Sequence, residues 1–436
     1  MRPSYLPRQR GHLSVDTPSR YVRAPAQRFG STRPRRRLTA VAPAPLPAHP
    51  APASPSGSPA GRRPWNPARA SVLAMALSLL AGLLLPLQAS AAQYCARTVA
   101  QLSLALDLAE ANNENNVIRI ARGVIAPAAP SDGHLFFYLS SKDRSLEISG
   151  GWDPVDCSSQ VLDPGSTRIE ANGSFGLFQA IIGSAGGNAR LRVHNLTLSG
   201  GSSDSLVARG LGLNVSGFQY VHGKVEIDRV VFADHHCSHA ESRGCALNFS
   251  FGIKEVVVRN SLFHHNSAGG TAAIRAWVTE DIQPVFRLHN NTLVDNYAHA
   301  PDQARASAVE FLGDTDTILM YNNILFGNPT LNAPVPLPDL ARDPAGAILG
   351  KHNNIAASAV TWTPDTSGNR SIPPVFAGRV DDYRLRGDSP LRDAGFNAGW
   401  PTHGLLELGG GPRVLGPTID LGAYESDVLF NAGFGD

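Results

Sequence analysis

The chain has 436 residues, of which 17% are charged, and its formal net charge is +2. This balance conceals a strong division, because residues 1–70 contain thirteen Arg, no Lys and one acidic residue and so carry +12. Residues 71–92 are uncharged, so residues 93–436 carry +2 less +12, which is −10. An acidic main body argues against a polyanion-binding groove, and we expect no nucleic-acid partner.

Residues 1–70 are rich in Pro, Ala and Arg and have no periodic apolar pattern, which predicts a disordered basic arm. A translation start assigned too far upstream would produce the same composition. The sequence leaves both interpretations open.

An apolar run over residues 71–87 follows Arg62, Arg63 and Arg69 and leads into the mostly small residues 88–92. This pattern predicts a signal peptide over residues 71–92, so the protein is expected to be extracellular or associated with the outer membrane or cell surface. The alternative is a transmembrane helix. The run is short for a membrane span and no basic cluster follows it, so we expect no span in the mature chain.

Four cysteines follow this segment: Cys95, Cys157, Cys237 and Cys245. An even number of cysteines in an exported chain favours disulfides. Of the three connectivities, we favour Cys237–Cys245, which closes a short loop, and Cys95–Cys157, which secures the N-terminal end. The alternative is a zinc site formed by Cys237 with the nearby His235, His236 and His239. That spacing matches no common zinc module, and we expect no metal there.

The next feature is a repeat of about 31 residues. Five segments align, and a weaker sixth copy follows: residues 192–201, 226–235, 257–266, 287–296, 319–328 and 352–355. Their shared polar column consists of Asn195, Arg229, Asn260, Asn290, Asn322 and Asn353, at spacings of 34, 31, 30, 32 and 31. A fixed period in this range indicates a repeat architecture.

Each unit contains short alternating apolar segments, such as residues 225–227 and 286–288, and a second apolar strand such as residues 246–249 or 308–311. No run in a unit has the helical period, so the units are predicted to be β. A propeller blade needs about 40 residues and four strands. Three short strands and their turns fit 31 residues, which predicts an all-β parallel β-helix.

Stacking gives the polar column a physical role. Equivalent residues of successive coils lie ~4.8 Å apart, so the amides of Asn195, Asn260, Asn290, Asn322 and Asn353 are expected to form a hydrogen-bonded ladder. Asn also tolerates the left-handed conformation of a tight bend. Arg229 interrupts the ladder. The open first coil is expected to be capped by a helix over residues 97–112, whose apolar face comprises Val99, Leu102, Leu106 and Ala109.

Several segments resemble exported bacterial right-handed β-helix proteins of the pectin-lyase-like superfamily: residues 117–123, residues 146–152 with Cys157, and residues 195–201. Residues 382–385, 389–390, 393–395, 412–413 and 420–425 resemble the closing signature of the choice-of-anchor Q type. The chain departs from it at Gly409–Gly411, where an Asp-containing turn is usual. The resemblance implies a right-handed β-helix domain over residues 93–425, in coils of three strands. The tail, residues 426–436, resembles short sorting or anchoring tails of some exported proteins.

The superfamily includes polysaccharide lyases and hydrolases, so enzymatic chemistry has to be considered. A lyase needs a base opposite acidic groups that hold Ca²⁺ or a uronate carboxylate, so Ca²⁺ is expected only if the protein is a lyase. The best column is Asp234, His265 and Asp295, one residue per coil. It could act in acid–base chemistry or weak metal binding. The alternative is that stacked turns align common turn formers.

A second row contains Asn248, Arg275 and Glu310, in which Arg275 could bind a sugar carboxylate. The alternative is an Arg–Glu pair on a solvated face. No lyase or polygalacturonase acid cluster is intact. We therefore expect a non-enzymatic surface or secreted protein, without a cofactor, that binds a polysaccharide or cell-surface glycan. The alternatives are a polysaccharide lyase, favoured over a hydrolase, that uses Asp234, His265 and Arg275, and a passive stalk.

Overall fold

The computed structural model describes residues 91–426, with gaps at 127–132, 174, 207, 218–219, 251, 278–282, 300–304, 314–316, 332–334, 345, 379 and 399–405. These residues belong to one compact unit, Leu84–Asp436. The predicted basic arm, nearly all of the predicted signal peptide and residues 427–436 of the predicted tail lie outside the described residues.

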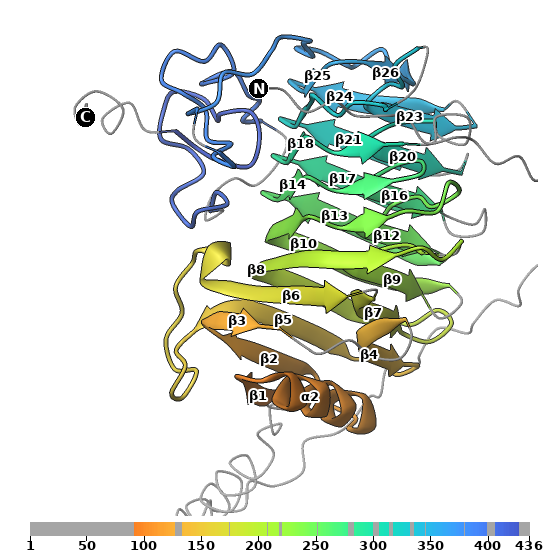
Figure 1. The fold of residues 1–436 in the computed structure, drawn as a ribbon, viewed down its shortest axis with the longest axis vertical. Helices are drawn as coiled ribbons and strands as arrows, with labels where there is room; N and C mark the ends of the chain where they lie inside the picture. Colours follow the sequence, from red (N-terminus) through yellow and green to blue (C-terminus); the bar gives the residue numbers. More distant parts are fainter. Residues whose placement is uncertain are drawn as a thin grey trace, which may run out of the picture. The chain divides into compact units, whose positions relative to one another are not determined.

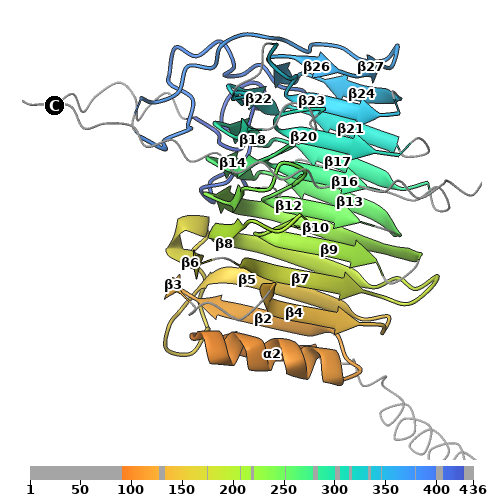
Figure 2. The same ribbon diagram turned by 45° about the vertical axis from the view of Figure 1, so that its right-hand side comes forward.

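Short parallel strands stack on one another in successive coils (Figures 1 and 2). The all-β parallel β-helix that the repeat predicted is thereby confirmed, and the aligned Asp228, Arg259, His289 and Tyr321 show its register of about 31 residues. Successive side chains of a strand point alternately towards the core and outward, so the inward positions are apolar and the outward positions can be polar. This is why the repeat consists of short alternating segments.

Each coil passes through up to four strand stacks, whereas three strands per coil were predicted. The first stack runs through β1 (Ala92–Ala96), β2 (Asn116–Ala121), β5 (Ser145–Trp152), β8 (Arg190–Ser203), β10 (Val221–Ala233), β13 (Ile253–Arg259), β17 (Val285–His289), β21 (Thr317–Tyr321), β24 (Ala347–Lys351) and β27 (Thr361–Trp362). The second comprises β3 (Gly123–Ile125), β6 (Thr167–Gly173), the later parts of β8 and β10, β14 (Leu262–His264), β18 (Thr292–Val294), β22 (Ile324–Phe326) and β25 (Asn354–Ile355).

The remaining strands form a short third stack and a separate sheet. The third stack contains β11 (His236–Cys237), β15 (Ser267–Ala268) and β19 (Tyr297–Ala298). The separate sheet contains β4 (His134–Ser140), β7 (Gly176–Ile182), β9 (Leu213–Gly217), β12 (Leu247–Ser250), β16 (Ile274–Trp277), β20 (Val309–Leu312), β23 (Leu340–Asp343) and β26 (Ser358–Ala359). A 3-10 turn, η1 (Pro164–Ser166), precedes β6.

Inward-facing side chains of equivalent strands stack through the coils and form the core. Phe232 and Phe263, one coil apart, have ring centroids 4.7 Å apart and nearly parallel planes. Both rings are fully buried. Burying one such ring stabilises the fold by about 1.5–3 kcal/mol, so the repeated core positions supply the main driving force for stacking.

A helix covers the first coil, as the apolar face of residues 97–112 predicted. Helix α2 (Val99–Ala111) is N-capped by Thr98, whose hydroxyl accepts a hydrogen bond from the Gln101 amide. Its buried side chains include Leu102 and Leu106. The disulfide Cys95–Cys157 secures this end, and Cys237–Cys245 closes the short loop, in the favoured connectivity. Because Cys237 is oxidised, it is not a zinc ligand. Two disulfides fit an oxidising compartment.

After the last coil the chain returns along the stack in an irregular C-terminal segment, residues 370–378, 380–398 and 406–426 (Figure 1, upper left). Its buried Leu391, Leu408 and Leu421 form a second apolar cluster with Leu262 and Val294 of the second stack. This segment therefore covers the outward side of β14 and β18, and it brings residues far apart in sequence to the turns that follow those strands.

Candidate functional site

The turn after the second stack repeats in left-handed conformation from coil to coil. Asp234, His265 and Asp295 have φ values of 57°, 53° and 53°, and Gly327 continues the column at 70°. Asp, Asn and His are enriched in this region relative to other residues that carry a side chain, and glycine is free to adopt it. The column predicted from the repeat is thus aligned, and its backbone conformation accounts for the type of residue found there.

The C-terminal segment adds further polar groups to this column. The Tyr383 hydroxyl donates to Asp295 Oδ2 at 3.0 Å and lies 3.5 Å from His265 Nε2. His265, Asp295, Asp381, Tyr383 and Phe376 line an open hollow of about 390 Å³. The repeat predicted the column alone, whereas the tertiary structure places the Tyr and a third carboxylate beside it.

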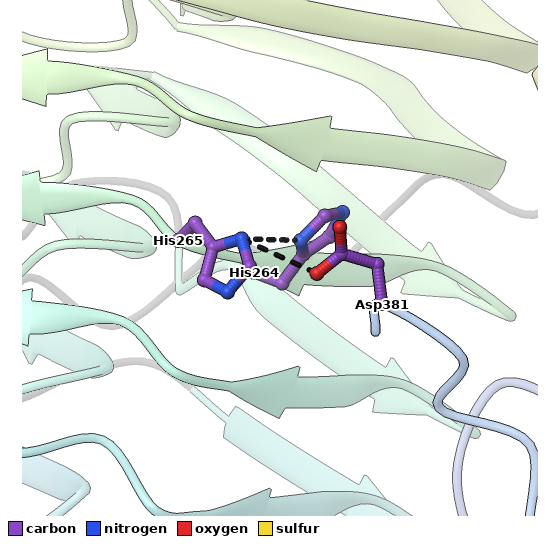
Figure 3. Close-up of side chains that lie close together, drawn as sticks. All are labelled: His264, His265 and Asp381. Atoms are coloured by element: carbon purple, nitrogen blue, oxygen red, sulfur yellow. Dashed lines mark hydrogen bonds and ion pairs between the residues drawn. The ribbon is translucent and has the colours of Figure 1, made fainter. Parts of the chain in front are cut away.

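His265 is the centre of the polar cluster (Figure 3). Its Nδ1 lies 3.3 Å from His264 Nδ1, 3.6 Å from Asp381 Oδ1 and 3.8 Å from Asp234 Oδ1. Among the described residues, His264, His265 and Asp381 are the one group of three whose ligand atoms lie within 4.8 Å of one another. The sequence places His264 beside this column, but it did not predict Asp381, since only the fold brings Asp381 to this turn.

Burial sets the protonation of this cluster. It lowers the pKa of His264 to about 4, an effect reinforced by the nearby His265. Partial burial also raises the pKa of Asp234, against the opposing influence of His265. The pKa of Tyr383 is raised by burial and further by Asp295. At neutral pH His264 is therefore a neutral imidazole and Tyr383 a protonated phenol.

The row Asn248, Arg275 and Glu310 lies in the separate sheet, where β12, β16 and β20 place the three side by side. The alternative of a solvated face is wrong, because Glu310 is 0% and Arg275 is 7% exposed. Arg275 Nη1 donates to Asn248 Oδ1 at 3.3 Å, and Arg243 Nη1 donates to Glu310 Oε1 at 3.1 Å. The structure therefore gives this row its own buried contacts and does not add Arg275 to the His265 cluster.

The predicted asparagine ladder occurs, with one correction. Asn322 Nδ2 donates to Asn290 Oδ1 at 3.1 Å, and Asn290 Nδ2 donates to Asn260 Oδ1 at 3.3 Å. Asn195 belongs to the same left-handed column and accepts a hydrogen bond from Arg229 Nη1. These amides are buried, so the ladder satisfies polar groups inside the fold.

Asn353 is wrongly placed in that column. His352 is the left-handed residue aligned with Asn322, because Tyr321 pairs with Lys351. Asn353 lies in a second buried ladder, where it accepts from Asn323 Nδ2 at 2.8 Å. The spacing from Asn322 to its structural equivalent, His352, is therefore 30 residues, one fewer than the sequence alignment assumed. A third ladder runs through Asn266, Asn296 and Asn328.

A different hollow, of about 340 Å³, crosses the start of β2, β5, β8 and β10 on the first stack. Its polar lining includes Glu147, Arg190, Arg192, Lys224 and Glu226. The Arg192 guanidinium lies 3.8 Å from Glu147, 3.4 Å from Glu226 and 3.6 Å from Asp228. Sequence reasoning did not single out this surface. Its signal is the charged residue between apolar ones, as in residues 225–227.

No described helix has the length and apolar character to cross a membrane. Comparison of the chain with family models, curated proteins and solved structures finds no match in any of the three. The fold is consistent with a surface or polysaccharide-related protein, and the site geometry is the remaining guide to function.

Proposed function

We propose that residues 93–425 form an exported β-helix protein that binds an acidic polysaccharide or cell-surface glycan without altering it chemically. The observation that carries this proposal is the hollow across β2, β5, β8 and β10. Four coils span three spacings of ~4.8 Å, so the hollow offers a polar track roughly 14 Å long. The resemblance to choice-of-anchor Q proteins supports export and a surface location.

The lining suits a carboxylated sugar. Residues 93–436 carry −10 overall, but among the residues that line this hollow Arg190, Arg192 and Lys224 outnumber Glu147 and Glu226 by one positive charge. Among the described residues, Arg190 is exposed and has no carboxylate partner. Guanidinium groups bind carboxylates through paired hydrogen bonds, while carboxylates and amides can accept and donate to sugar hydroxyls. Aliphatic Val117 and Leu191 complete the floor.

The test is binding of uronate-containing and neutral oligosaccharides to the full chain by isothermal titration calorimetry. We expect binding of a uronate oligosaccharide that weakens as salt is added. Replacing Arg190 and Lys224 together by Ala should weaken it about tenfold or more, which is roughly 1.4 kcal/mol. The exposed Arg386→Ala variant serves as control and should bind normally. Absence of uronate binding, or equal binding by both variants, would contradict the proposal.

A polysaccharide lyase is the second candidate, and the observation that favours it is the hollow containing Tyr383 and His265. Tyr and His are common proton-transfer groups. Because the raised pKa keeps Tyr383 protonated, it would supply a proton to a leaving group. Incubation with the same uronate panel distinguishes the two. A glycan-binding protein releases no unsaturated product. A lyase releases such a product, and its Tyr383→Phe variant should release none.

A further inference from the structure

We propose that His264, His265 and Asp381 form a binding site for a transition-metal ion, with Zn²⁺ as the best-suited ion. The site would connect the C-terminal segment to the stack. It lies in the hollow that contains His265 and Tyr383, at the turn after β14, away from the first-stack surface assigned to glycan binding.

The distances between the donor atoms fit a tetrahedral ion. Zn–N bonds of ~2.0–2.1 Å at tetrahedral angles place two ligand atoms ~3.3 Å apart. His264 Nδ1 and His265 Nδ1 are 3.3 Å apart, and Asp381 Oδ1 is 3.6 Å from His265 Nδ1. Imidazole nitrogen and carboxylate oxygen are standard zinc ligands. The ligand atoms of all three residues lie within 4.8 Å of one another, so side-chain adjustment alone would bring them to one ion.

The fold explains why two consecutive histidines can act together. Successive residues of a strand point to opposite faces, which would separate His264 from His265. His265, however, directly follows the last residue of β14 and has left-handed φ, so the alternation is broken there and the two Nδ1 atoms converge. Figure 3 shows Asp381 approaching the same point from the C-terminal segment.

The surrounding groups suit a cation. Asp234 Oδ1, 3.8 Å from His265 Nδ1, supplies a second nearby carboxylate, and its 61% side-chain exposure leaves room for a water ligand instead. The Tyr383 hydroxyl, 3.5 Å from His265 Nε2, is placed to orient the ring from the far side.

The site would join residues that lie 116 positions apart in the sequence, from His265 to Asp381. A metal ion that binds the folded chain but not the unfolded chain stabilises the folded state. The free energy of unfolding then rises with the logarithm of the metal concentration. Metal uptake should therefore hold the C-terminal segment against β14 and β18, and it should act on that segment more than on the distant cap.

The experiment uses the full chain without a polyhistidine tag, stripped with a chelator and then titrated with Co²⁺ or Zn²⁺. We expect one equivalent of Co²⁺ to produce the intense visible absorption of a tetrahedral complex, and Zn²⁺ to displace it. Zn²⁺ should also raise the melting temperature and slow hydrogen exchange in residues 376–386. Failure to bind one equivalent would overturn the proposal.

Variants locate the site. His265→Ala and Asp381→Asn should each weaken Zn²⁺ binding at least tenfold, and circular dichroism verifies that both remain folded. Both side chains are partly exposed, so neither change empties the core. The matched controls, His222→Ala and Asp388→Asn, change exposed residues outside the cluster and should bind normally. Equal affinity in all four variants would show that any bound metal is held elsewhere.

Discussion

At the scale of single residues, the polar side chains at the turns satisfy buried backbone groups. Asn323 is fully buried, and its Nδ2 donates to the carbonyl of Leu288 and to Asn353 Oδ1, each at 2.8 Å. Its Oδ1 accepts from both the backbone and the side chain of Asn291 at 3.0 Å. An unpaired buried polar group is costly, so these amides are required by the backbone rather than by a ligand.

Asn323→Ala should therefore destabilise the fold by about 2–4 kcal/mol, since it leaves several buried partners unpaired at about 1–3 kcal/mol each. Urea unfolding followed by circular dichroism measures this change. Asn113→Ala, at an exposed position, is the control and should change stability by less than about 0.5 kcal/mol. Similar midpoints for the two variants would contradict the role of the ladder.

Asp339 at the end of the third ladder predicts a pH effect. Burial raises the pKa of Asp339 to about 6, although Asn328 Nδ2 donates to it at 2.9 Å. The folded state holds this proton more tightly than the unfolded chain, whose pKa is near 3.8. Its contribution is therefore complete below about pH 4 and is lost as pH rises through 6.

The stability of the wild-type protein relative to Asp339→Asn should fall by about 1–3 kcal/mol between pH 4 and pH 7, because one pKa unit corresponds to ~1.4 kcal/mol. Unfolding curves for both proteins at each pH measure the difference. A difference that stays constant across this range, or that grows with pH, would contradict the assignment.

At the scale of elements, the C-terminal segment is the structural partner of the second stack. The Gly422 amide donates to the Asn322 carbonyl at 2.7 Å, and the Ala423 amide donates to Thr292 Oγ1 at 2.9 Å. Within the segment, the buried Arg413 donates through Nη2 to the carbonyls of Asp420 and Gly422. The segment thus has an internal framework that presents Asp381 and Tyr383 to the turn column.

Arg413→Ala should destabilise this segment by about 3–5 kcal/mol, as expected when one member of a buried charged group is removed. Arg413 is fully buried, with Nε 4.0 Å from Glu425 Oε2. Hydrogen exchange should increase over residues 406–426 and remain slow in β10 and β13. The control, Arg386→Ala, removes a solvated pair with Asp388 and should leave exchange unchanged. Equal protection in both variants would refute the role of Arg413.

At the scale of the whole β-helix, each coil contacts mainly its neighbours, so stability spreads from coil to coil and depends on protected ends. Helix α2 covers β1, β2 and β4 at the first end. The disulfide Cys95–Cys157 links the start of this cap to the chain 62 positions later. The second disulfide, Cys237–Cys245, closes a separation of only eight.

Replacing Cys95 and Cys157 by Ser should cost about 4 kcal/mol, against about 2.5 kcal/mol for Cys237 and Cys245, because the longer loop restricts the unfolded chain more. Urea unfolding of the two double variants measures the order. In the variant that lacks Cys95 and Cys157, hydrogen exchange should increase first in α2 and β2. A larger loss in the short-loop variant would show that loop length does not govern these disulfides.

The sequence by itself determined the repeat, the β-helix, the capping helix and the alignment of Asp234, His265 and Asp295. All of these depend on a local pattern that returns every 31 residues or so, and stacking converts equal spacing into contact. The one-residue error at Asn353 arose because a weak final copy no longer constrains its own register.

Only the tertiary structure decided which groups surround His265. Asp381 and Tyr383 come from a segment without a repeat, so no spacing connects them to the turn after β14. Their approach depends on the packing of Leu391, Leu408 and Leu421 against the second stack. Arg275 and His265 are only ten residues apart, but Arg275 lies in β16 of the separate sheet and His265 follows β14 of the other sheet, so the path of the coil keeps them apart.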